Sequence, residues 1–241
     1  MTDLRQTKEW ANFLSLSGWT VVGNSPYEFY RKILFFYIRK VQRTDTLPRA
    51  TLPTIATYFE PLAIIPSLHR ASSCLPTSTL IVDLNKPLRL SENARRILRR
   101  KTRTTLLDPE IFYQNYHRHC KFHTLSHTGF NHLVKAFGSK CHLLGFLHDR
   151  LPVAGIILLC SKDASFYYQA WTSPLGRKLG AQYHLVYSAL KLSQKLKLKY
   201  FDFDGIEDPR FPRKSWSGFT QFKKKFGGEI KNFPGCFIKW F

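Results

Sequence analysis

The sequence predicts an α/β fold in which helices flank a mixed, mostly antiparallel sheet. Its 241 residues are 44% hydrophobic and 15% aromatic, which is typical of a folded globular chain. Three apolar runs between residues 142 and 171 follow one another at turn-length intervals, as in an antiparallel meander. An amphipathic helical pattern then leads to a further strand, so helices and strands combine around one sheet.

Residues 1–90 are predicted to hold one helix and several strands. Trp10 and Phe13 fall on one helical face, and Gly18 follows as a stop signal. Aromatic and β-branched residues predict strands at residues 19–22, 28–41 and 55–59. Prolines punctuate the remainder of residues 48–76, which we expect to be loops.

Residues 91–105 are predicted to form a basic helix. Its arginines occupy two adjacent rows on one face: Arg95, Arg96, Arg99, Arg100 and Arg103. A solvated helix surface is the alternative interpretation. Because like charges four residues apart repel and only Glu92 lies nearby to compensate them, we favour a face that binds a polyanion.

The remaining elements are predicted to build the central sheet. Two helices are expected at residues 109–122 and 129–137. The meander follows with strands at residues 142–148, 153–161 and 165–171. A long amphipathic helix over residues 179–196 then precedes strands at residues 200–203 and 236–240.

The charge of the chain limits its partners. Lys and Arg number 37 against 16 Asp and Glu, a net charge of +21, which favours nucleic acid, phosphorylated small molecules or an anionic membrane face. The first residues lack the apolar core of a signal peptide, and the longest apolar stretch, Leu151–Cys160, is too short to cross a bilayer. We therefore expect a cytoplasmic protein, with only peripheral contact with the inner face of the membrane. The odd count of five cysteines, without Cys-x-x-Cys spacing, favours reduced thiols.

The segment Gly218–Glu229 combines aromatic residues, a lysine cluster and a glycine pair. Lysines attract phosphates, and aromatic rings offer a flat face to bases or sugars. Glycines let the backbone turn where a side chain would clash. A solvated turn between two strands is the alternative, but in a chain of this charge we favour contact with a polyanion.

Histidines crowd into residues 117–127, and His119, His123 and His127 could share a helix face as zinc ligands do. No carboxylate or second cysteine completes a familiar ligand spacing, so we predict no metal site. The absence of a Gly-x-Ser-x-Gly elbow and of a Gly-x-x-x-x-Gly-Lys-Ser/Thr loop argues against an α/β-hydrolase or an NTPase.

Arg177 and Lys178 lie beside a predicted helix start, where backbone N–H groups can accept a phosphate. With Gly180, this run resembles the loop that holds the coenzyme A pyrophosphate in GNAT-superfamily acyltransferases. Gln182 departs from that pattern, which has a small residue there. Ordinary charges at a helix start are the alternative.

Asp202 and Asp204 alternate with aromatic residues, which places both on one face at a strand end. They could orient an amine or accept its proton. We favour a structural role in which the acids of this cluster pair with Arg210 and Arg213, and keep Asp202 and Asp204 as candidates for substrate binding.

Five segments carry a resemblance when they are taken in order. They are Gln6–Phe13 with Gly18-Trp19, Leu80–Leu84 with the basic helix, Phe166–Ala170 with Ser173-Pro174, Tyr200–Ile206, and Gly218–Gly228. In this order they resemble the FemAB peptidoglycan-bridge aminoacyltransferases, also called the lipid II:glycine glycyltransferase family, which use the GNAT fold. In the last segment Phe222-Lys223 precedes an aromatic residue and two glycines, as in the signature of the family.

The resemblance implies a domain organisation. It implies a shortened N-terminal GNAT-like subdomain in residues 1–88, a full GNAT-like aminoacyltransferase domain in residues 89–228, and a C-terminal strand in residues 229–241 that returns to the N-terminal part. The chain departs from the family at Leu14, where a lysine is frequent, and at Asp204, where a glycine is usual. The short first part, and the lack of the coiled-coil arm of some members, leave the acceptor open.

The resemblance also implies a reaction. An amine on the stem peptide of a peptidoglycan precursor, either lipid II or a UDP-linked muropeptide, attacks the ester of an aminoacyl-tRNA, with no cofactor and no metal. Such a transfer mainly needs positioning and stabilisation of an oxyanion, roles that fall to Lys223, while Phe222 shapes the pocket. The alternatives are a coenzyme A-dependent N-acyltransferase that acts on a cell-envelope precursor, and a non-catalytic RNA-binding module.

The remaining candidate residues divide by partner. Candidates for the precursor are Tyr167, Tyr168, Arg118, Lys121, Asp202 and Asp204. Candidates for tRNA or other phosphates are Arg95, Arg96, Arg99, Arg100, Arg103, Arg177, Lys178, Lys224 and Lys225.

Overall fold

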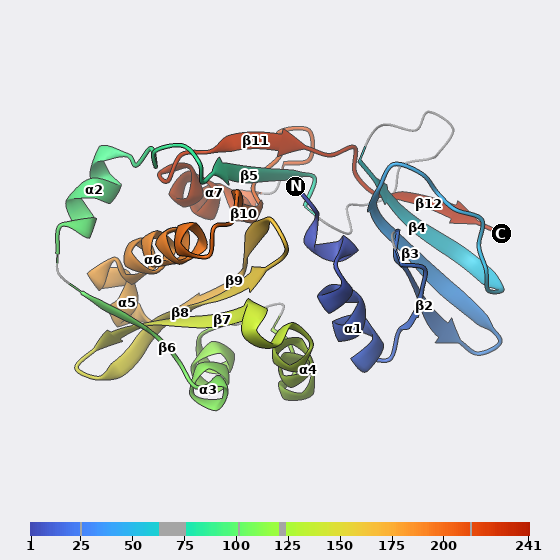
Figure 1. The fold of residues 1–241 in the computed structure, drawn as a ribbon, viewed down its shortest axis with the longest axis horizontal. Helices are drawn as coiled ribbons and strands as arrows, with labels where there is room; N and C mark the ends of the chain where they lie inside the picture. Colours follow the sequence, from blue (N-terminus) through green and yellow to red (C-terminus); the bar gives the residue numbers. More distant parts are fainter. Residues whose placement is uncertain (25, 63–75, 101, 121–123, 213) are drawn as a thin grey trace.

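Two mixed β-sheets lie side by side, and helix α1 (Lys8–Leu16) lies between them (Figure 1). The computed structural model describes residues 1–24, 26–62, 76–100, 102–120, 124–212 and 214–241. Helices cover both faces of the larger sheet. The predicted α/β class with a mixed sheet and flanking helices is therefore confirmed.

The smaller sheet has five strands in the order β1-β2-β3-β4-β12. Its strands are β1 (Thr20–Val22), β2 (Glu28–Ile33), β3 (Phe36–Thr44), β4 (Thr54–Pro61) and β12 (Phe237–Trp240). Only β3 and β4 are parallel. The short helix η1 (Leu4–Gln6) and α1 precede it, and the Thr7 side chain begins α1 by accepting a hydrogen bond from the Trp10 amide.

The larger sheet has seven strands in the order β11-β5-β10-β9-β8-β7-β6. They are β5 (Ser78–Asp83), β6 (Arg103–Leu106), β7 (Cys141–His148), β8 (Leu151–Cys160), β9 (Ala164–Thr172), β10 (Tyr200–Gly205) and β11 (Glu229–Asn232). Strands β7, β8 and β9 form the predicted antiparallel meander. Strands β9 and β10 are the parallel pair.

The helices sort onto the two faces of this sheet. They are α2 (Glu92–Leu98), α3 (Pro109–His119), α4 (His127–Phe137), η2 (Gly138–Lys140), α5 (Pro174–Leu179), α6 (Ala181–Lys195), η3 (Lys214–Trp216) and α7 (Ser217–Lys224). Side chains of β8 alternate between two cores: Ile156 packs with α6, whereas Ile157 packs with α1, α3 and α4. This two-sided burial holds the centre of the sheet in place for the site described below.

Several predicted elements were wrong at their boundaries or in kind. The basic helix ends at Leu98, and Arg103 begins β6, because β-branched threonines favour a strand. The strand expected at residues 28–41 is a hairpin that turns at Leu34 and Phe35. The helix expected at residues 179–196 is interrupted at Gly180, whose φ of 67° separates α5 from α6.

The helix expected at residues 109–122 ends at His119, and residues 121–123 lie outside the described residues. Sheet membership changes between β4 and β5 and again between β11 and β12. The division of the chain at residues 88 and 228 stays a prediction. Among the helices that the structure describes, none is both long and apolar enough to span a bilayer.

Candidate active site

Strands β9 and β10 separate at the centre of the larger sheet. Their ladder pairs Tyr200–Asp202 with Ala164–Phe166 and then stops, although both strands continue. The backbone carbonyls at the end of β10 are therefore free to meet groups from other elements. The candidate site is built around this separation.

Lys223 of α7 places its ammonium group at the end of β10. The side chain is only 7% exposed, and Nζ donates hydrogen bonds to the carbonyl of Phe203 at 2.8 Å and to that of Gly205 at 2.5 Å. The ring of Tyr167 lies 5.5 Å and the ring of Phe219 4.9 Å from Nζ. An ammonium group has three N–H donors, so among the described residues two are used and one is left for a ligand.

Burial lowers the pKa of Lys223 to about 8, although the carboxylates of Asp204 and Asp202 favour its charged form. The ammonium form therefore still dominates at neutral pH. Lys223 and Thr220 are the buried residues of α7, and their spacing of three places them on one helix face. The Thr220 hydroxyl accepts a hydrogen bond from the Glu207 amide at 2.8 Å, which fixes the helix beside the end of β10.

Asp202 and Asp204 approach the same strand end from the opposite face. Asp202 is 3% exposed, and its carboxylate accepts hydrogen bonds from the Thr79 hydroxyl and, at 2.7 Å, from the Asp204 amide. Burial, together with the charge of Asp204, raises the pKa of Asp202 to about 7. Asp204 forms an ion pair with the buried Arg5 at 3.0 Å.

The expected pairing of this acid cluster is correct in one instance. Asp208 pairs with Arg210 at 2.7 Å, whereas Asp204 pairs with Arg5, which lies 199 positions away in the sequence. Arg213 lies outside the described residues. Asp204 also has a φ of 56°, a left-handed conformation that glycine adopts most readily, at the position where the FemAB-like pattern usually has glycine.

The two candidate tyrosines of β9 face opposite sides of the sheet. Tyr167 lies on the Lys223 side, and its hydroxyl donates to the Gln182 side chain at 3.4 Å. The ring of Tyr168 packs edge-on against Trp10 at 5.9 Å, on the side of α1. Only Tyr167 therefore shares a face with the ammonium group.

A basic pocket of about 440 Å³ lies where α2, α5 and α6 meet. Its lining residues are Arg96, Ile97, Arg100, Arg177, Lys178, Leu179, Gly180 and Tyr183. Four of these side chains are cationic, and no acidic residue is among the described lining residues. Gly180 supplies no side-chain cap to α6, so the N–H groups at this helix start add to the attraction for a phosphate.

Tyr183 connects the basic pocket to the segment that carries Lys223. Its hydroxyl accepts a hydrogen bond from Lys225 Nζ at 2.9 Å, and its ring meets that of Phe222 edge-on at 5.0 Å. Phe222 therefore packs toward the basic pocket, whereas its neighbour Lys223 points into the separation between β9 and β10.

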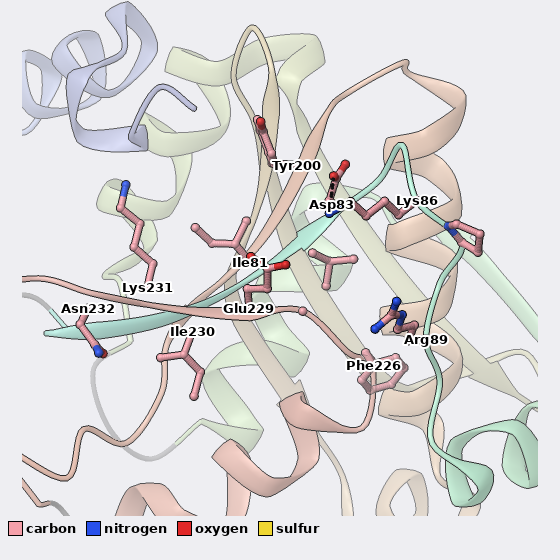
Figure 2. A pocket seen from close by; sticks show the side chains of 13 residues that line it. Ile81, Asp83, Lys86, Arg89, Tyr200, Phe226, Glu229, Ile230, Lys231 and Asn232 are labelled. Atoms are coloured by element: carbon pink, nitrogen blue, oxygen red, sulfur yellow. Dashed lines mark ion pairs between the residues drawn. The ribbon is translucent and has the colours of Figure 1, made fainter.

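A second cavity, of about 700 Å³, follows strands β5 and β11 (Figure 2). Its charged lining residues are Asp83, Lys86, Arg89, Glu229 and Lys231. The glycine pair shapes its end: Gly227 and Gly228 have φ values of 77° and 104°, and a Cβ on Gly228 would lie 2.8 Å from the carbonyl oxygen of Ile81. The sequence did not predict this cavity, because residues 229–241 were expected to form one strand and form two, β11 and β12, in different sheets.

Other candidates fall outside the two clusters. Arg118 is exposed at the end of α3, where it lowers the pKa of His119 after the larger effect of burial. Lys121 lies outside the described residues. Arg95, Arg99 and Arg103 are exposed but do not line the basic pocket, and Lys224 lines a different cavity. Within the described residues, no three potential metal ligands gather.

Sequence reasoning missed four residues of the site, namely Arg5, Thr79, Tyr183 and Phe219. Thr79 and its partner Asp202 are 123 positions apart, and no local pattern marks such a contact. Phe219 lay inside the Gly218–Glu229 segment but gave no sign of its own. The helical spacing of Phe219 and Lys223, four residues apart, could have indicated that they share a face.

Two separating parallel strands, with a helix N-terminus beside them, are typical of a GNAT-like fold. Residues 147–240 match the model of the FemAB family, and this segment contains Lys223, Asp202 and Tyr167. The resemblance to the FemAB family is therefore confirmed over residues 147–240. No curated protein sequence matches the chain.

Solved structures give the same fold. "Crystal structure of FemX" matches with a TM-score of 0.79 at 14% identity, covering 100% of this chain and 92% of that one. The C-terminal domain of a putative lysylphosphatidylglycerol synthetase from Agrobacterium fabrum matches with a TM-score of 0.64 at 11% identity, covering 98% and 88%. A GCN5-related N-acetyltransferase from Kribbella flavida matches with a TM-score of 0.53 at 9% identity, covering 99% and 95%.

Proposed function

We propose that this protein is an aminoacyltransferase that moves an amino acid from aminoacyl-tRNA to the stem-peptide amine of a peptidoglycan precursor. The observation that carries the proposal is the buried ammonium group of Lys223, fixed between two strand-end carbonyls in the segment that matches the FemAB family. The overall match to the FemX structure supports the same class of reaction.

The reaction requires a new C–N bond and the loss of a C–O bond. The acceptor amine attacks the ester carbonyl, negative charge develops on its oxygen, and the ribose hydroxyl of the tRNA leaves with a proton. The third N–H group of Lys223 stabilises the oxyanion. A donor that is already fixed in a buried place acts without reorganisation, which is the most effective form of such stabilisation.

The donor and acceptor approach from different sides in this proposal. The basic pocket binds phosphates near the end of the tRNA, and Tyr183 and Phe222 lie on the path from there to Lys223. Tyr167 contacts the acceptor. Asp202 and Asp204 lie on the opposite face of the sheet, where Asp204 is paired with Arg5, so they act on this site through their charge, which favours the ammonium form of Lys223.

The test is transfer of radiolabelled amino acid from a mixed aminoacyl-tRNA pool to lipid II or to its UDP-linked precursor. Lys223→Ala is expected to lower the transfer rate by about 10²–10³, as the loss of an oxyanion donor does. Lys162→Ala, an exposed lysine on the turn between β8 and β9, is the matched control. Full activity of Lys223→Ala would overturn the assigned role, and absence of label with every tRNA and acceptor would overturn the reaction.

A coenzyme A-dependent N-acyltransferase is the second candidate, because the cationic pocket at the start of α6 also suits a pyrophosphate. Gln182 favours tRNA over coenzyme A. Its Nε2 donates to the carbonyl of Trp171 at 2.8 Å and to the Thr172 hydroxyl at 2.8 Å, so the side chain fills the position where the coenzyme A pattern has a small residue. Calorimetric titration with coenzyme A and with aminoacyl-tRNA separates the two donors. RNA binding without any transfer would instead indicate a non-catalytic RNA-binding module.

A further inference from the structure

The β2–β3 hairpin ends in four exposed apolar residues. Ile33 is 41% exposed, Leu34 81%, Phe35 86% and Phe36 49%. A contiguous apolar surface of this kind on a folded protein commonly marks an interaction site. We call these four residues the apolar tip.

Trp240, the last residue of β12, lies at the same end of the smaller sheet. Trp240 pairs with Ala56 near the start of β4, and Thr54 of β4 pairs with Tyr37, next to the tip. Trp240 is 69% exposed. This end of the sheet points away from the larger sheet, at the right of Figure 1. The apolar tip and Trp240 can therefore contact one flat surface together.

The turn itself indicates that the apolar residues serve a purpose other than folding. The two-residue turn consists of Leu34 and Phe35, and Leu34 has a φ of 52°. Such turns favour glycine or asparagine, because a bulky side chain is strained in this conformation. Folding alone would therefore favour glycine at position 34.

The surroundings of the apolar tip are basic. Arg31, Lys32 and Lys239 are exposed beside it. No aspartate or glutamate occurs in residues 29–44, 46–59 or 230–241. This end of the molecule therefore presents apolar side chains at its centre and positive charge around them.

We propose that the apolar tip inserts into the interface of an anionic phospholipid bilayer. The apolar side chains enter the boundary between headgroups and acyl chains, and the indole of Trp240 lies at headgroup level. The lysine and arginine side chains bind lipid phosphates. The proposal does not depend on the transfer reaction, since it concerns lipid alone.

The test uses vesicles of phosphatidylglycerol mixed with phosphatidylcholine, without any precursor, and measures sedimentation of protein with the vesicles. The double variant Leu34→Gly with Phe35→Asn keeps every charge and relieves the strained turn. We expect it to unfold at the same or a higher urea concentration than the wild type. Its affinity for the vesicles should fall at least about tenfold.

Leu151→Ser is the matched control, since Leu151 is 67% exposed at the start of β8 and follows Arg150 of the β7–β8 turn. It should bind vesicles as the wild type does. Equal binding by all three proteins would show that net charge alone causes adsorption and would overturn the proposal. Sedimentation velocity tests whether the apolar tip instead binds a second copy of this chain. A wild-type dimer that becomes a monomer in the double variant, with unchanged vesicle binding, would overturn the lipid proposal in favour of self-association.

Discussion

Lys223 is an ammonium group withdrawn from water, and two backbone carbonyls replace part of its hydration. The arrangement differs from an ion pair, because neither carbonyl neutralises the charge. The full positive charge therefore stays available to a ligand. The nearest carboxylates, those of Asp204 and Asp202, lie on the other face of the sheet. Their charge partly offsets the lowering of the Lys223 pKa, but they do not take up the hydrogen-bond donors of its ammonium group.

The pH dependence of transfer tests the state of Lys223. Because burial lowers its pKa to about 8, the ammonium form is present at neutral pH and is lost as pH rises through that value. The rate should therefore decline roughly tenfold per pH unit above about pH 8. A free amine nucleophile alone would give the opposite trend, since it becomes more reactive at high pH. A profile of kcat/KM that keeps rising to about pH 9.5 would contradict the role of the ammonium group.

The raised pKa of Asp202 predicts how the stability of the folded protein depends on pH. Its pKa is about 7 in the folded protein and 3.8 ordinarily, so the folded state binds the proton more tightly. The free energy of unfolding should therefore fall as pH rises from about 4 to 7. Asp202→Asn keeps an acceptor for Thr79 but cannot ionise, so this decline should be smaller by about 1.4 kcal/mol per unit of pKa shift.

Urea unfolding of wild type and Asp202→Asn at pH values across this interval measures that difference. Other titrating groups are common to both proteins, so the comparison isolates one carboxyl group. Parallel pH profiles for the two proteins would show that Asp202 is not perturbed as described.

At the scale of elements, Gly180 decides where α5 ends and α6 begins. Its φ of 67° is unfavourable for any residue with a Cβ, and a Cβ there would also lie 3.1 Å from Ile97. Gly180→Ala should lower the free energy of unfolding by about 1 kcal/mol or more. Gly218→Ala in α7 is the control, because nothing lies within 4 Å of its Cβ position and alanine favours a helix. Chemical denaturation should show a loss for the first and no loss for the second; equal losses would contradict the account.

Elements with strong periodicity could be predicted from the sequence, and elements set by turns could not. The meander of β7, β8 and β9 was predicted because its apolar runs are separated by polar turn residues. The β2–β3 turn was missed because Leu34 and Phe35 carry no turn signal. The arginine spacing predicts a helix that runs into β6, whereas the β-branched threonines there favour the observed strand.

The residues of the candidate site were likewise predictable where a local pattern marks them, and not where distant segments of the chain meet. The Phe222-Lys223 pair was identified through a local pattern, and the structure places Tyr167, Asp202 and Asp204 around it. Contacts that join distant parts of the chain, such as Arg5 with Asp204, depend on the completed fold. No single-sequence pattern encodes them, which is why the sequence predicts the pairing of this acid cluster with Arg210 but not the pairing of Asp204 with Arg5.

At the scale of the whole molecule, the net charge of +21 predicts a strong dependence of RNA binding on salt. If about 6–10 phosphates are contacted, affinity should fall by about 10³–10⁵ between 50 and 200 mM salt. Arg100→Ala should lower the slope of log affinity against log salt by about 0.7–0.9, because one phosphate contact is lost. Filter binding of tRNA across this range measures both, with Lys162→Ala as the control, and a flat salt response would contradict the tRNA assignment.

The return of β12 to β4 has a consequence for synthesis on the ribosome. Strands β1 to β4 emerge early, but the outer edge of β4 stays unpaired until residues 237–240 have been translated. An unpaired strand edge can pair with other chains and start aggregation. The nascent protein therefore carries an open edge while the chain between β4 and β12 is being translated, and chaperone binding during that interval would raise the yield of folded protein.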